Sequence, residues 1–516
     1  MPQPQNAIRL AHITKTFGEV VANRDVSLEV RRGEILSLLG ENGSGKTTLM
    51  NMIAGIYYPD EGQIFLGEEP VDIRSPRDAL RLGIGMIHQH FKLVDVFTAL
   101  ENIALCMEPG RRLDLRRVRS QARAICEKYG FALDLDQKVY EMSVSQKQTL
   151  EIVKVLFRGA DILILDEPTA VLTPQETEKL FAVMRNMKAD GKAVIIITHK
   201  LHEVLTVSDR VAILRRGEYV GTVNTCDATE ETLTEMMVGK KVELDIERPE
   251  PDHPVRRLCI QHLSVNSPEG GRVLDDVSFD VYGGEILGIA GISGNGQKEL
   301  LEAIAGLQRV EGGASIQFFP PEAEDRPASL LGKSPRDIRE AGIHLSFVPE
   351  DRRGMGLVGS MGMTDNMMLK SYGSGHSPLV DRKAPRELAE EIRQELGVVT
   401  PGLNTPVSQL SGGNVQKVLV GRELAASPVV LMTAYAVRGL DINTSYTIYR
   451  LLNEQKKKGV AVIYVGEDLD VLLELCDRIL VLCGGRANGM LDGRTATKEE
   501  VGLRMTNLQT ETEVHA

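Results

Sequence analysis

The chain has 516 residues, which is too long for one ordinary domain and predicts two to four domains. Its net charge of −12 argues against a protein that coats nucleic acid or an anionic membrane along its whole length. Apolar residues make up 42% and charged residues 26%, as in soluble globular proteins, and no apolar run approaches the roughly 18 residues that span a bilayer.

The N-terminus and the cysteines both indicate an intracellular protein. The opening stretch MPQPQNAIRL lacks the basic start and the apolar core of a secretory signal. The six cysteines are scattered without a CxxC pair, which favours reduced thiols over a disulfide framework or a zinc site. We therefore expect a soluble protein inside the cell.

Residues 40–47 read GENGSGKT and match the phosphate-loop pattern G-x-x-x-x-G-K-[ST]. The strand-like EILSLL precedes this loop and the helical TTLMNMIAG follows it, so a chance glycine-rich turn does not account for the pattern. Glycines let backbone N–H groups and the helix N-terminus face phosphate oxygens. We expect Lys46 to reach the β- and γ-phosphates of a nucleotide and Thr47 to bind Mg²⁺. The predicted nucleotide-binding residues of the loop are Gly40, Asn42, Gly43, Ser44, Gly45, Lys46, Thr47 and Thr48.

Residues 161–169, DILILDEPT, read as a buried central strand that ends in two adjacent carboxylates, Asp166 and Glu167. An acidic surface pair is the alternative, but a strand this apolar places its carboxyl end beside a ligand crevice. We expect Asp166 to join the Mg²⁺ shell and Glu167 to polarise the attacking water. His199 follows the next apolar strand, AVIIIT, and this position favours a contact with the γ-phosphate over a purely structural role.

The helical segment ETEKLFAVMRNMKADGK connects these two strands, and the order strand, helix, strand predicts an α/β domain with a largely parallel sheet. A charged segment with three prolines, residues 242–257, follows the domain and is interpreted as a linker. We assign residues 1–241 to the first domain, 258–505 to a second domain and 506–516 to a tail that we expect to be disordered.

The second domain repeats the first. The segment RVLDDVSFDVYGGEILGIAGISGNGQKELLEAIAG aligns with VANRDVSLEVRRGEILSLLGENGSGKTTLMNMIAG, so that Gly291 corresponds to Gly40. A period this long indicates duplicated domains rather than a solenoid. The second loop, GISGNGQKEL, carries Gln297 where the first carries Lys46. A dinucleotide-binding interpretation of its glycines is weak, since the corresponding first loop is of the phosphate type.

Four motifs resemble those of the ATP-binding subunits of ABC transporters: GENGSGKT, LILDEPT, the strand-end His199, and LSGGNVQK at residues 410–417. The last resembles the ABC signature, which other phosphate-loop ATPases lack, and the resemblance covers nearly the whole chain. It implies an α/β fold of two tandem ABC-type nucleotide-binding domains. Each would have a mainly parallel core sheet, a β-subdomain, and a helical subdomain that carries the signature. It also implies that Phe17 stacks on adenine and that a glutamine loop at Gln89 contacts Mg²⁺ and the membrane partner.

The resemblance further implies that each ATP lies between the phosphate loop of one domain and the signature of the other, in a pseudo-dimer of the two domains. For the first site, the catalytic residues implied are Glu167, His199 and Gln89, and the metal ligands are Thr47, Gln89 and Asp166. To this site the second domain would contribute Ser411, Gly412, Gly413 and Asp441. The cofactors implied are ATP and Mg²⁺.

The second site departs from this pattern at most of its positions, and we expect it not to hydrolyse ATP. The second domain nevertheless keeps LSGGN and RGLD, the parts that would serve the first site. Whether backbone amides of the second loop still hold a nucleotide stays open. The departures are Gln297 for the lysine, Lys298 for the hydroxyl, Ala434 and Tyr435 for the carboxylates, Glu350 and Glu467 for the glutamine and histidine, Pro268 for Phe17, and Ser145 for a glycine in the opposing signature.

More narrowly, the tandem arrangement resembles the fused ATPase subunits of importers for simple sugars and nucleosides. The segments MIHQHFKLVDVFTALENIAL, RGADILILDEPTAVLTPQE and ITHKLHEV most resemble the nucleoside-uptake branch, with monosaccharide uptake of the ribose, galactose or xylose type as the alternative. The resemblance implies an ATP-hydrolysing subunit, peripheral on the cytoplasmic face of the inner membrane. Its partners would be integral membrane permeases and, indirectly, an extracytoplasmic solute-binding protein, with no nucleic acid.

Two other classes are alternatives. A soluble tandem ABC protein that acts on ribosomes or DNA would typically keep two competent sites and a long charged inter-domain segment. A nucleotide-gated regulator with little turnover is disfavoured by the presence of Glu167 and His199.

Overall fold

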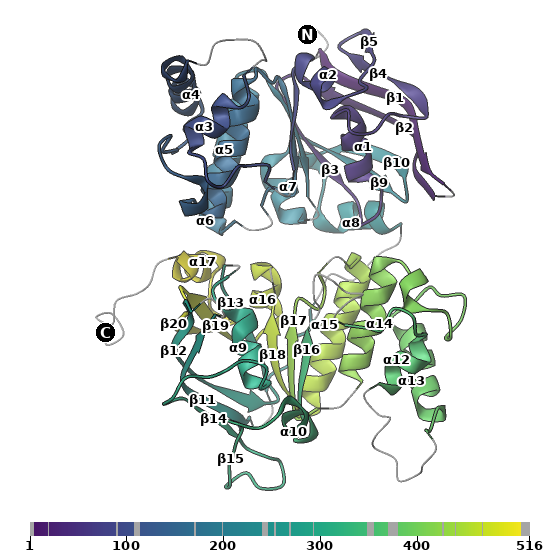
Figure 1. Ribbon diagram of the computed structural model, residues 1–516. Helices are drawn as coiled ribbons and strands as arrows, with labels where there is room; N and C mark the ends of the chain where they lie inside the picture. Colours follow the sequence, from purple (N-terminus) through teal and green to yellow (C-terminus); the bar gives the residue numbers. More distant parts are fainter. Residues whose placement is uncertain are drawn as a thin grey trace. The chain divides into compact units, whose positions relative to one another are not determined.

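The chain divides into two compact units, Met1–Glu243 and Leu244–Ala516, and their boundary lies within the segment predicted as a linker (Figure 1). No helix in the described part of the chain has the length and apolar character needed to cross a bilayer. The computed structural model describes residues 5–18, 20–88, 91–107, 114–169, 172–198, 200–239, 246–251, 254–267, 270–292, 294–347, 356–369, 380–425, 428–438, 440–466 and 468–506.

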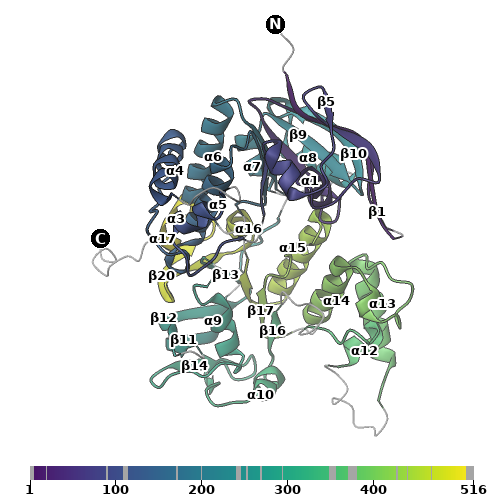
Figure 2. The same cartoon turned by 45° about the horizontal axis from the view of Figure 1, so that its top comes forward.

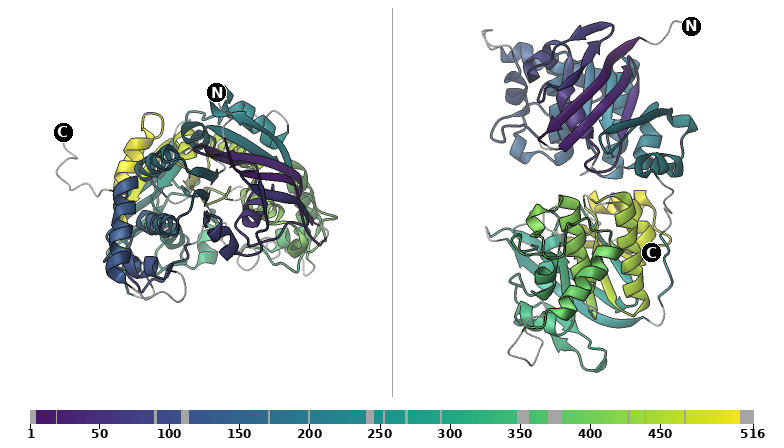
Figure 3. Two further views of the ribbon diagram at one scale, coloured as in Figure 1. Left: turned by 90° about the horizontal axis from the view of Figure 1, so that it is seen from above. Right: turned by 90° about the vertical axis from the view of Figure 1, so that its right-hand side faces the viewer.

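The first unit begins with an antiparallel sheet in the strand order β2-β1-β4-β5. The long strands β1 and β2 run side by side (Figure 3). Their buried apolar residues lie in the same core cluster as those of helix α1. This sheet is the predicted β-subdomain. Its strands are β1 (Asn6–Phe17), β2 (Val20–Arg31), β4 (Glu61–Leu66) and β5 (Glu69–Val71).

A six-stranded sheet in the order β10-β9-β3-β8-β7-β6 forms the centre of the first unit. All of its pairs are parallel except the antiparallel pair β10 and β9 at one edge. The predicted central strands DILILD and AVIIIT are β7 and β8, which lie next to each other. The strands are β3 (Ile35–Leu39), β6 (Ile84–Ile87), β7 (Ile162–Asp166), β8 (Ala193–Ile197), β9 (Arg210–Arg215) and β10 (Glu218–Asn224).

Both faces of this sheet are covered, which explains why its central strands are apolar at successive positions. Leu36 and Leu38 of β3 face the cluster that contains α1 and the antiparallel sheet, whereas Ile35 faces the cluster that contains α6. Because β3, β8 and β7 are parallel neighbours, their carboxyl ends meet at one edge of the sheet. The helices around the sheet are α1 (Lys46–Ile53), α2 (Pro76–Arg81), α6 (Pro174–Ala189), α7 (Leu201–Val207) and α8 (Glu230–Val238).

Three further helices of the first unit have an apolar core of their own and lie together in Figure 2. Leu100, Val118 and Leu150 are buried in this core, one from each helix. The group is the predicted helical subdomain, and its last helix begins within residues 142–148, MSVSQKQ, which align with the signature of the second unit. The helices are α3 (Ala99–Ala104), α4 (Leu115–Tyr129) and α5 (Val144–Phe157).

The second unit repeats this architecture, with sheets in the orders β12-β11-β14-β15 and β16-β17-β18-β13-β19-β20. This confirms the predicted α/β fold of two tandem domains. Its strands are β11 (Val255–Asn266), β12 (Arg272–Gly283), β13 (Ile286–Ala290), β14 (Ser315–Phe318), β15 (Ala328–Ser329), β16 (Ile343–Phe347), β17 (Val430–Ala434), β18 (Ala461–Val465), β19 (Arg478–Cys483) and β20 (Arg486–Asp492). Its helices are α9 (Gln297–Ile304), α10 (Pro335–Glu340), α12 (Met363–Met368), α13 (Lys383–Glu395), α14 (Gly412–Leu424), α15 (Ile442–Lys457), α16 (Leu469–Leu475) and α17 (Lys498–Thr506).

Part of the segment predicted as a linker packs on the second unit. The guanidinium of Arg248 donates to the carbonyl oxygens of Leu473, Cys476 and Gly493 over 2.7 to 2.9 Å. Ile246 lies against the apolar core of the same unit. Residues 246–251 therefore belong structurally to the second unit.

Candidate active site

The loop between β3 and α1 depends on its glycines. Gly43 and Gly45 have φ of 82° and 94°, which residues with side chains rarely adopt. A Cβ on Gly45 would lie 2.3 Å from the carbonyl oxygen of Ala22, so only glycine fits where α1 begins. Because the N-cap of α1 is Gly45, it has no side chain to cover the first N–H groups of the helix, and these can face an anion.

Lys46 opens helix α1 and is buried within the loop. Its ammonium donates to the carbonyl oxygens of Gly40 and Glu41 over 2.7 and 2.9 Å. Burial lowers the pKa of Lys46 to about 8, while the nearby carboxylates of Glu167 and Asp166 act in the opposite direction. A buried ammonium inside a glycine loop is suited to the charge of a nucleotide phosphate.

The two carboxylates at the end of β7 lie beside this loop. Burial raises the pKa of Asp166 to about 6, and the negative charge of Glu167 adds to this effect. The charge of Lys46 and a hydrogen bond with Thr47 act in the opposite direction. The carboxyl ends of β3 and β7 thus bring together an ammonium, a hydroxyl and two carboxylates from motifs that are far apart in the sequence.

Thr47 and Asp166 supply the hard oxygen ligands that Mg²⁺ prefers. Among the described residues, no three His, Cys, Asp or Glu side chains converge as a metal site made of protein alone. Mg²⁺ usually binds through one or two carboxylates together with water and substrate phosphates. The hydroxyl and carboxylate pair therefore fits this ion when a nucleotide is bound.

Glu167 has a left-handed backbone with φ of 46°, although it is not glycine. Its N–H donates to the carbonyl oxygen of Ile197, the last residue of β8, over 2.9 Å. A residue in this region costs on the order of 1–3 kcal/mol and persists where the surrounding structure imposes it, commonly at functional sites. The turn places the carboxylate of Glu167 near enough to Lys46 to influence its pKa.

Phe17, the last residue of β1, is 44% exposed. Its ring packs edge-on against Tyr57 with the centroids 5.2 Å apart, and the ammonium of Lys15 lies 5.5 Å from the ring centroid. An exposed ring held by such contacts can stack on a base. Tyr57 follows α1 in the chain, and nothing in its local sequence predicts this contact.

Ser411 and Asp441 each cap a helix of the second unit. Ser411 is the N-cap of α14, and its hydroxyl oxygen accepts from the side-chain amide of Asn414 over 2.9 Å. Gly412 and Gly413 form the first turn of α14, and a Cβ on Gly413 would meet no described atom within 4 Å. Asp441 is the N-cap of α15. The first turn of α14 is therefore capped by Ser411 and has free space beside Gly413 within its own unit.

A sequence model of the protein family described as ABC transporter matches the chain twice, at residues 23–170 and 274–433. The chain belongs to the ABC transporter ATP-binding family. This confirms the resemblance found in the four motifs, and it makes the chain an ATPase.

The ABC chain is similar over almost its whole length to import ATP-binding proteins. It is 40% identical to the nucleoside import ATP-binding protein NupA of Lactococcus lactis subsp. cremoris (strain MG1363), over 97% of this chain and 98% of that protein. It is 39% identical to the guanosine import ATP-binding protein NupO of Bacillus subtilis (strain 168), over 96% and 97%. It is 38% identical to the ribose import ATP-binding protein RbsA 2 of Streptomyces coelicolor (strain ATCC BAA-471 / A3(2) / M145), over 96% and 94%.

The second phosphate loop of this ABC ATPase keeps the glycine backbone of the first but lacks its charge. Gly294 and Gly296 have φ of 91° and 95°, close to the values of the first loop. Gln297 is buried, and its amide donates to the carbonyl oxygen of Ile292 over 3.2 Å. This contact parallels that of Lys46 with its own loop, with a neutral amide in place of an ammonium.

The strand end of the second ABC unit also keeps its geometry and loses its carboxylates. Ala434 pairs with Val465 as Asp166 pairs with Ile197. Tyr435 follows with φ of 56°, in the same left-handed region as Glu167 in the first unit. Alanine and tyrosine therefore stand where the first unit has its acidic pair.

Some predicted positions lie outside the described residues. In the first unit these are Gln89 and His199, and in the second they are Pro268, Glu350 and Glu467.

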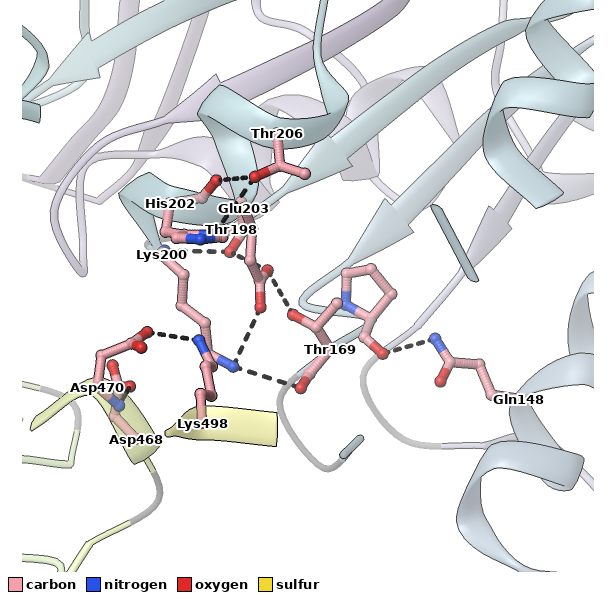
Figure 4. A network of polar contacts seen from close by, with 11 residues as sticks. Gln148, Thr169, Thr198, Lys200, His202, Glu203, Thr206, Asp468, Asp470 and Lys498 are labelled. Atoms are coloured by element: carbon pink, nitrogen blue, oxygen red, sulfur yellow. Dashed lines mark hydrogen bonds and ion pairs between the residues drawn. The ribbon is translucent and has the colours of Figure 1, made fainter. Parts of the chain in front are cut away.

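One group of polar residues near the site was not predicted from the sequence. Glu203 on α7 is buried, and its Oε2 accepts from the hydroxyls of Thr169 and Thr198 over 2.6 and 3.2 Å (Figure 4). Lys200 pairs with the same carboxylate at 3.2 Å. The sequence signal that could have found the group is the absence of these side chains from the second copy of the domain.

Proposed function

We propose that the chain is the ATP-hydrolysing subunit of an ABC importer for nucleosides. The observation that carries the proposal is the convergence of Lys46, Thr47, Asp166 and Glu167 in one domain, at the carboxyl ends of its strands. The nucleoside assignment is supported by the similarity to NupA and NupO, whose names specify nucleoside and guanosine import.

Each side chain of the first domain has a proposed role in hydrolysis. Lys46 would bind the β- and γ-phosphates, together with the first N–H groups of α1. Thr47 and Asp166 would hold Mg²⁺, which supplies positive charge to the phosphates. Glu167 would orient the attacking water and accept its proton. Phe17 would stack on the adenine ring.

The proposed active site takes its remaining groups from other parts of the chain. Ser411 and the N-terminus of α14 would donate hydrogen bonds to the γ-phosphate, since a helix N-terminus favours an anion. Gln89 would contact Mg²⁺ and His199 the γ-phosphate. The residues proposed to come from the second domain are Ser411, Gly412, Gly413 and Asp441.

The second phosphate loop is proposed not to support hydrolysis. Gln297 offers a neutral amide, Ala434 offers no ligand for Mg²⁺, and the phenol of Tyr435 does not replace a carboxylate base at neutral pH. Its loop still has the glycine backbone of a phosphate cradle, so nucleotide binding without turnover is compatible with this loop.

Ser411→Ala should lower ATP turnover at least about tenfold, because it removes a donor proposed to face the γ-phosphate. Ser143→Ala is the matched control. Ser143 caps α5 as Ser411 caps α14, so both changes should lower the free energy of unfolding by a similar amount, about 0.5–2 kcal/mol. Steady-state ATP hydrolysis and Tm of both variants are measured on the full-length chain. Equal losses of turnover would contradict the proposal that only the first phosphate loop, with Ser411, supports hydrolysis.

Purification of the native membrane complex tests the transport assignment. We expect integral membrane permeases to copurify with the chain from the cytoplasmic face of the inner membrane, together with a receptor that binds labelled nucleosides. A receptor that binds pentoses or hexoses would keep the importer and make the solute a monosaccharide, the second candidate, which the similarity to RbsA 2 favours. Copurification with ribosomes or nucleic acid alone would contradict the transport function.

A further inference from the structure

A comparison of the two units distinguishes the buried polar groups that both units contain from those that only the first unit contains. Glu34 is buried and pairs with Arg210 at 3.3 Å, and Glu285 pairs with Arg478 at 3.2 Å at the corresponding place in the second unit. An ion pair that both copies keep serves the shared fold. A buried polar group present only beside the complete phosphate-loop and carboxylate motifs is instead a candidate for a role in hydrolysis.

The network around Glu203 is such a group. Its carboxylate accepts from the hydroxyl of Thr169, in the segment that follows β7, and from that of Thr198, directly after β8 (Figure 4). Lys200 lies 3.2 Å from the same carboxylate and donates to the carbonyl oxygen of Thr169 over 3.4 Å. Glu203, Thr169 and Thr198 are all buried. One carboxylate on α7 thus ties together the segments that leave two neighbouring strands.

At the positions that match Glu203, Thr169 and Thr198, the second unit has apolar residues or glycine, and Asp468 stands where the first unit has Lys200. Val471 is the third residue of α16, as Glu203 is the third residue of α7. Val437 and Gly466 follow β17 and β18 where the two threonines follow β7 and β8. Val437 and Val471 pack against the apolar core of that unit. The same fold therefore forms without a buried carboxylate at this place, so the carboxylate is not needed for folding alone.

Other interactions of the segment that follows β7 have counterparts in the segment that follows β17 of the second unit. A backbone carbonyl of the segment accepts from the amide of Gln148 over 2.7 Å in the first unit, and from that of Gln416 over 3.0 Å in the second. The left-handed residue occurs at both Glu167 and Tyr435. These shared features set the turn after the strand. In the first unit, Glu203 additionally connects the ends of β7 and β8 through its hydrogen bonds with Thr169 and Thr198.

We propose that Glu203 is a positioning residue for ATP hydrolysis, an inference that rests on the proposed role of Glu167 as the base. The carboxylate of Glu203 fixes Thr169, two residues beyond Glu167, against Thr198. This restrains the backbone that follows β7, and with it the orientation of the Glu167 carboxylate toward the attacking water. Lys200 balances the buried negative charge, so the network restrains the segment without adding net charge beside the phosphates.

The substitution Glu203→Val introduces the side chain found in the second copy and tests the proposal. We expect kcat for ATP hydrolysis by the full-length chain to fall at least about tenfold, because displacement of a catalytic group by about 1 Å can cost 10²-fold. The Kd for ATP should change by less than about threefold, because Lys46 and its loop are untouched. Glu203→Gln keeps an oxygen that accepts from Thr169 and should restore most of kcat. Thr169→Val should lower kcat in the wild-type background and have no further effect in Glu203→Val.

The control is Glu34→Gln, which changes a buried carboxylate at the opposite end of the sheet. It should lower Tm with kcat unchanged. Wild-type kcat in Glu203→Val, or an equal loss of kcat in Glu34→Gln at equal Tm, would overturn the proposal. If Glu203→Val fails to fold, the nearly isosteric Thr169→Val tests the proposal in its place. An unchanged kcat in Thr169→Val would overturn the proposal. Absence of ATP hydrolysis by the wild-type chain would contradict the proposed function itself, and this inference with it.

Discussion

Glu167→Gln should remove nearly all ATP turnover while ATP binding persists. The amide keeps the shape of the side chain but cannot accept a proton from water, and loss of a general base typically costs about 10²- to 10⁴-fold in rate. Lys46 and the N–H groups of its loop are unchanged, so ATP should remain bound without being cleaved. The measurement is steady-state hydrolysis together with the amount of ATP that copurifies with the variant.

Tyr435→Phe is the matched control for this change, because Tyr435 occupies the same left-handed position in the second unit. We expect it to leave turnover within about twofold of the wild type, since hydrolysis is proposed only at the first phosphate loop and the hydroxyl of Tyr435 has no part in it. A loss in Tyr435→Phe as large as that in Glu167→Gln would mean that both strand ends take part in hydrolysis.

Lys46→Ala should lower turnover by about 10²- to 10³-fold and weaken ATP binding as well. The ammonium of Lys46 is buried in its loop, where it donates to two carbonyl oxygens at 2.7 and 2.9 Å. Its removal takes away the positive charge proposed to hold the β- and γ-phosphates, and alanine offers no substitute. Turnover and the Kd for ATP are measured on the same preparation.

Gln297→Ala makes the equivalent change in the second loop, where the amide donates to a carbonyl oxygen at 3.2 Å. Because the amide carries no charge and its strand end has no carboxylate, we expect little change in turnover. Similar damage from Gln297→Ala and Lys46→Ala would contradict a single competent site. Both residues are buried at the start of their helices, so Tm of the two variants shows whether any difference comes from folding.

The fold could be predicted because its signals are local and occur twice. The strand β7 reads as apolar at successive positions since both faces of the sheet are covered. The glycines of residues 40–47 include Gly43 and Gly45, whose φ values residues with side chains rarely adopt. Repetition of both patterns in the second half implied a second copy of the domain. The attachment of Arg248 to the second unit could not be read in the same way, because its acceptors are backbone carbonyls, which leave no mark in the sequence.

The candidate site was predicted in part for the same reason. Lys46, Thr47, Asp166 and Glu167 belong to motifs with fixed local spacing, whereas β3 and β7 are separated in the sheet by β8, so their meeting depends on strand order. Glu203 carries no motif of its own. Its importance arises from hydroxyls on two other segments, which become neighbours only in the folded domain.

The most direct test is the uptake of labelled nucleoside by membrane vesicles that contain the chain with its native permeases and receptor. We expect ATP-dependent accumulation with the wild-type chain and with Gln297→Ala, and none with Glu167→Gln. Nucleoside uptake by Glu167→Gln at the wild-type rate would contradict the claim that hydrolysis at the first phosphate loop powers transport.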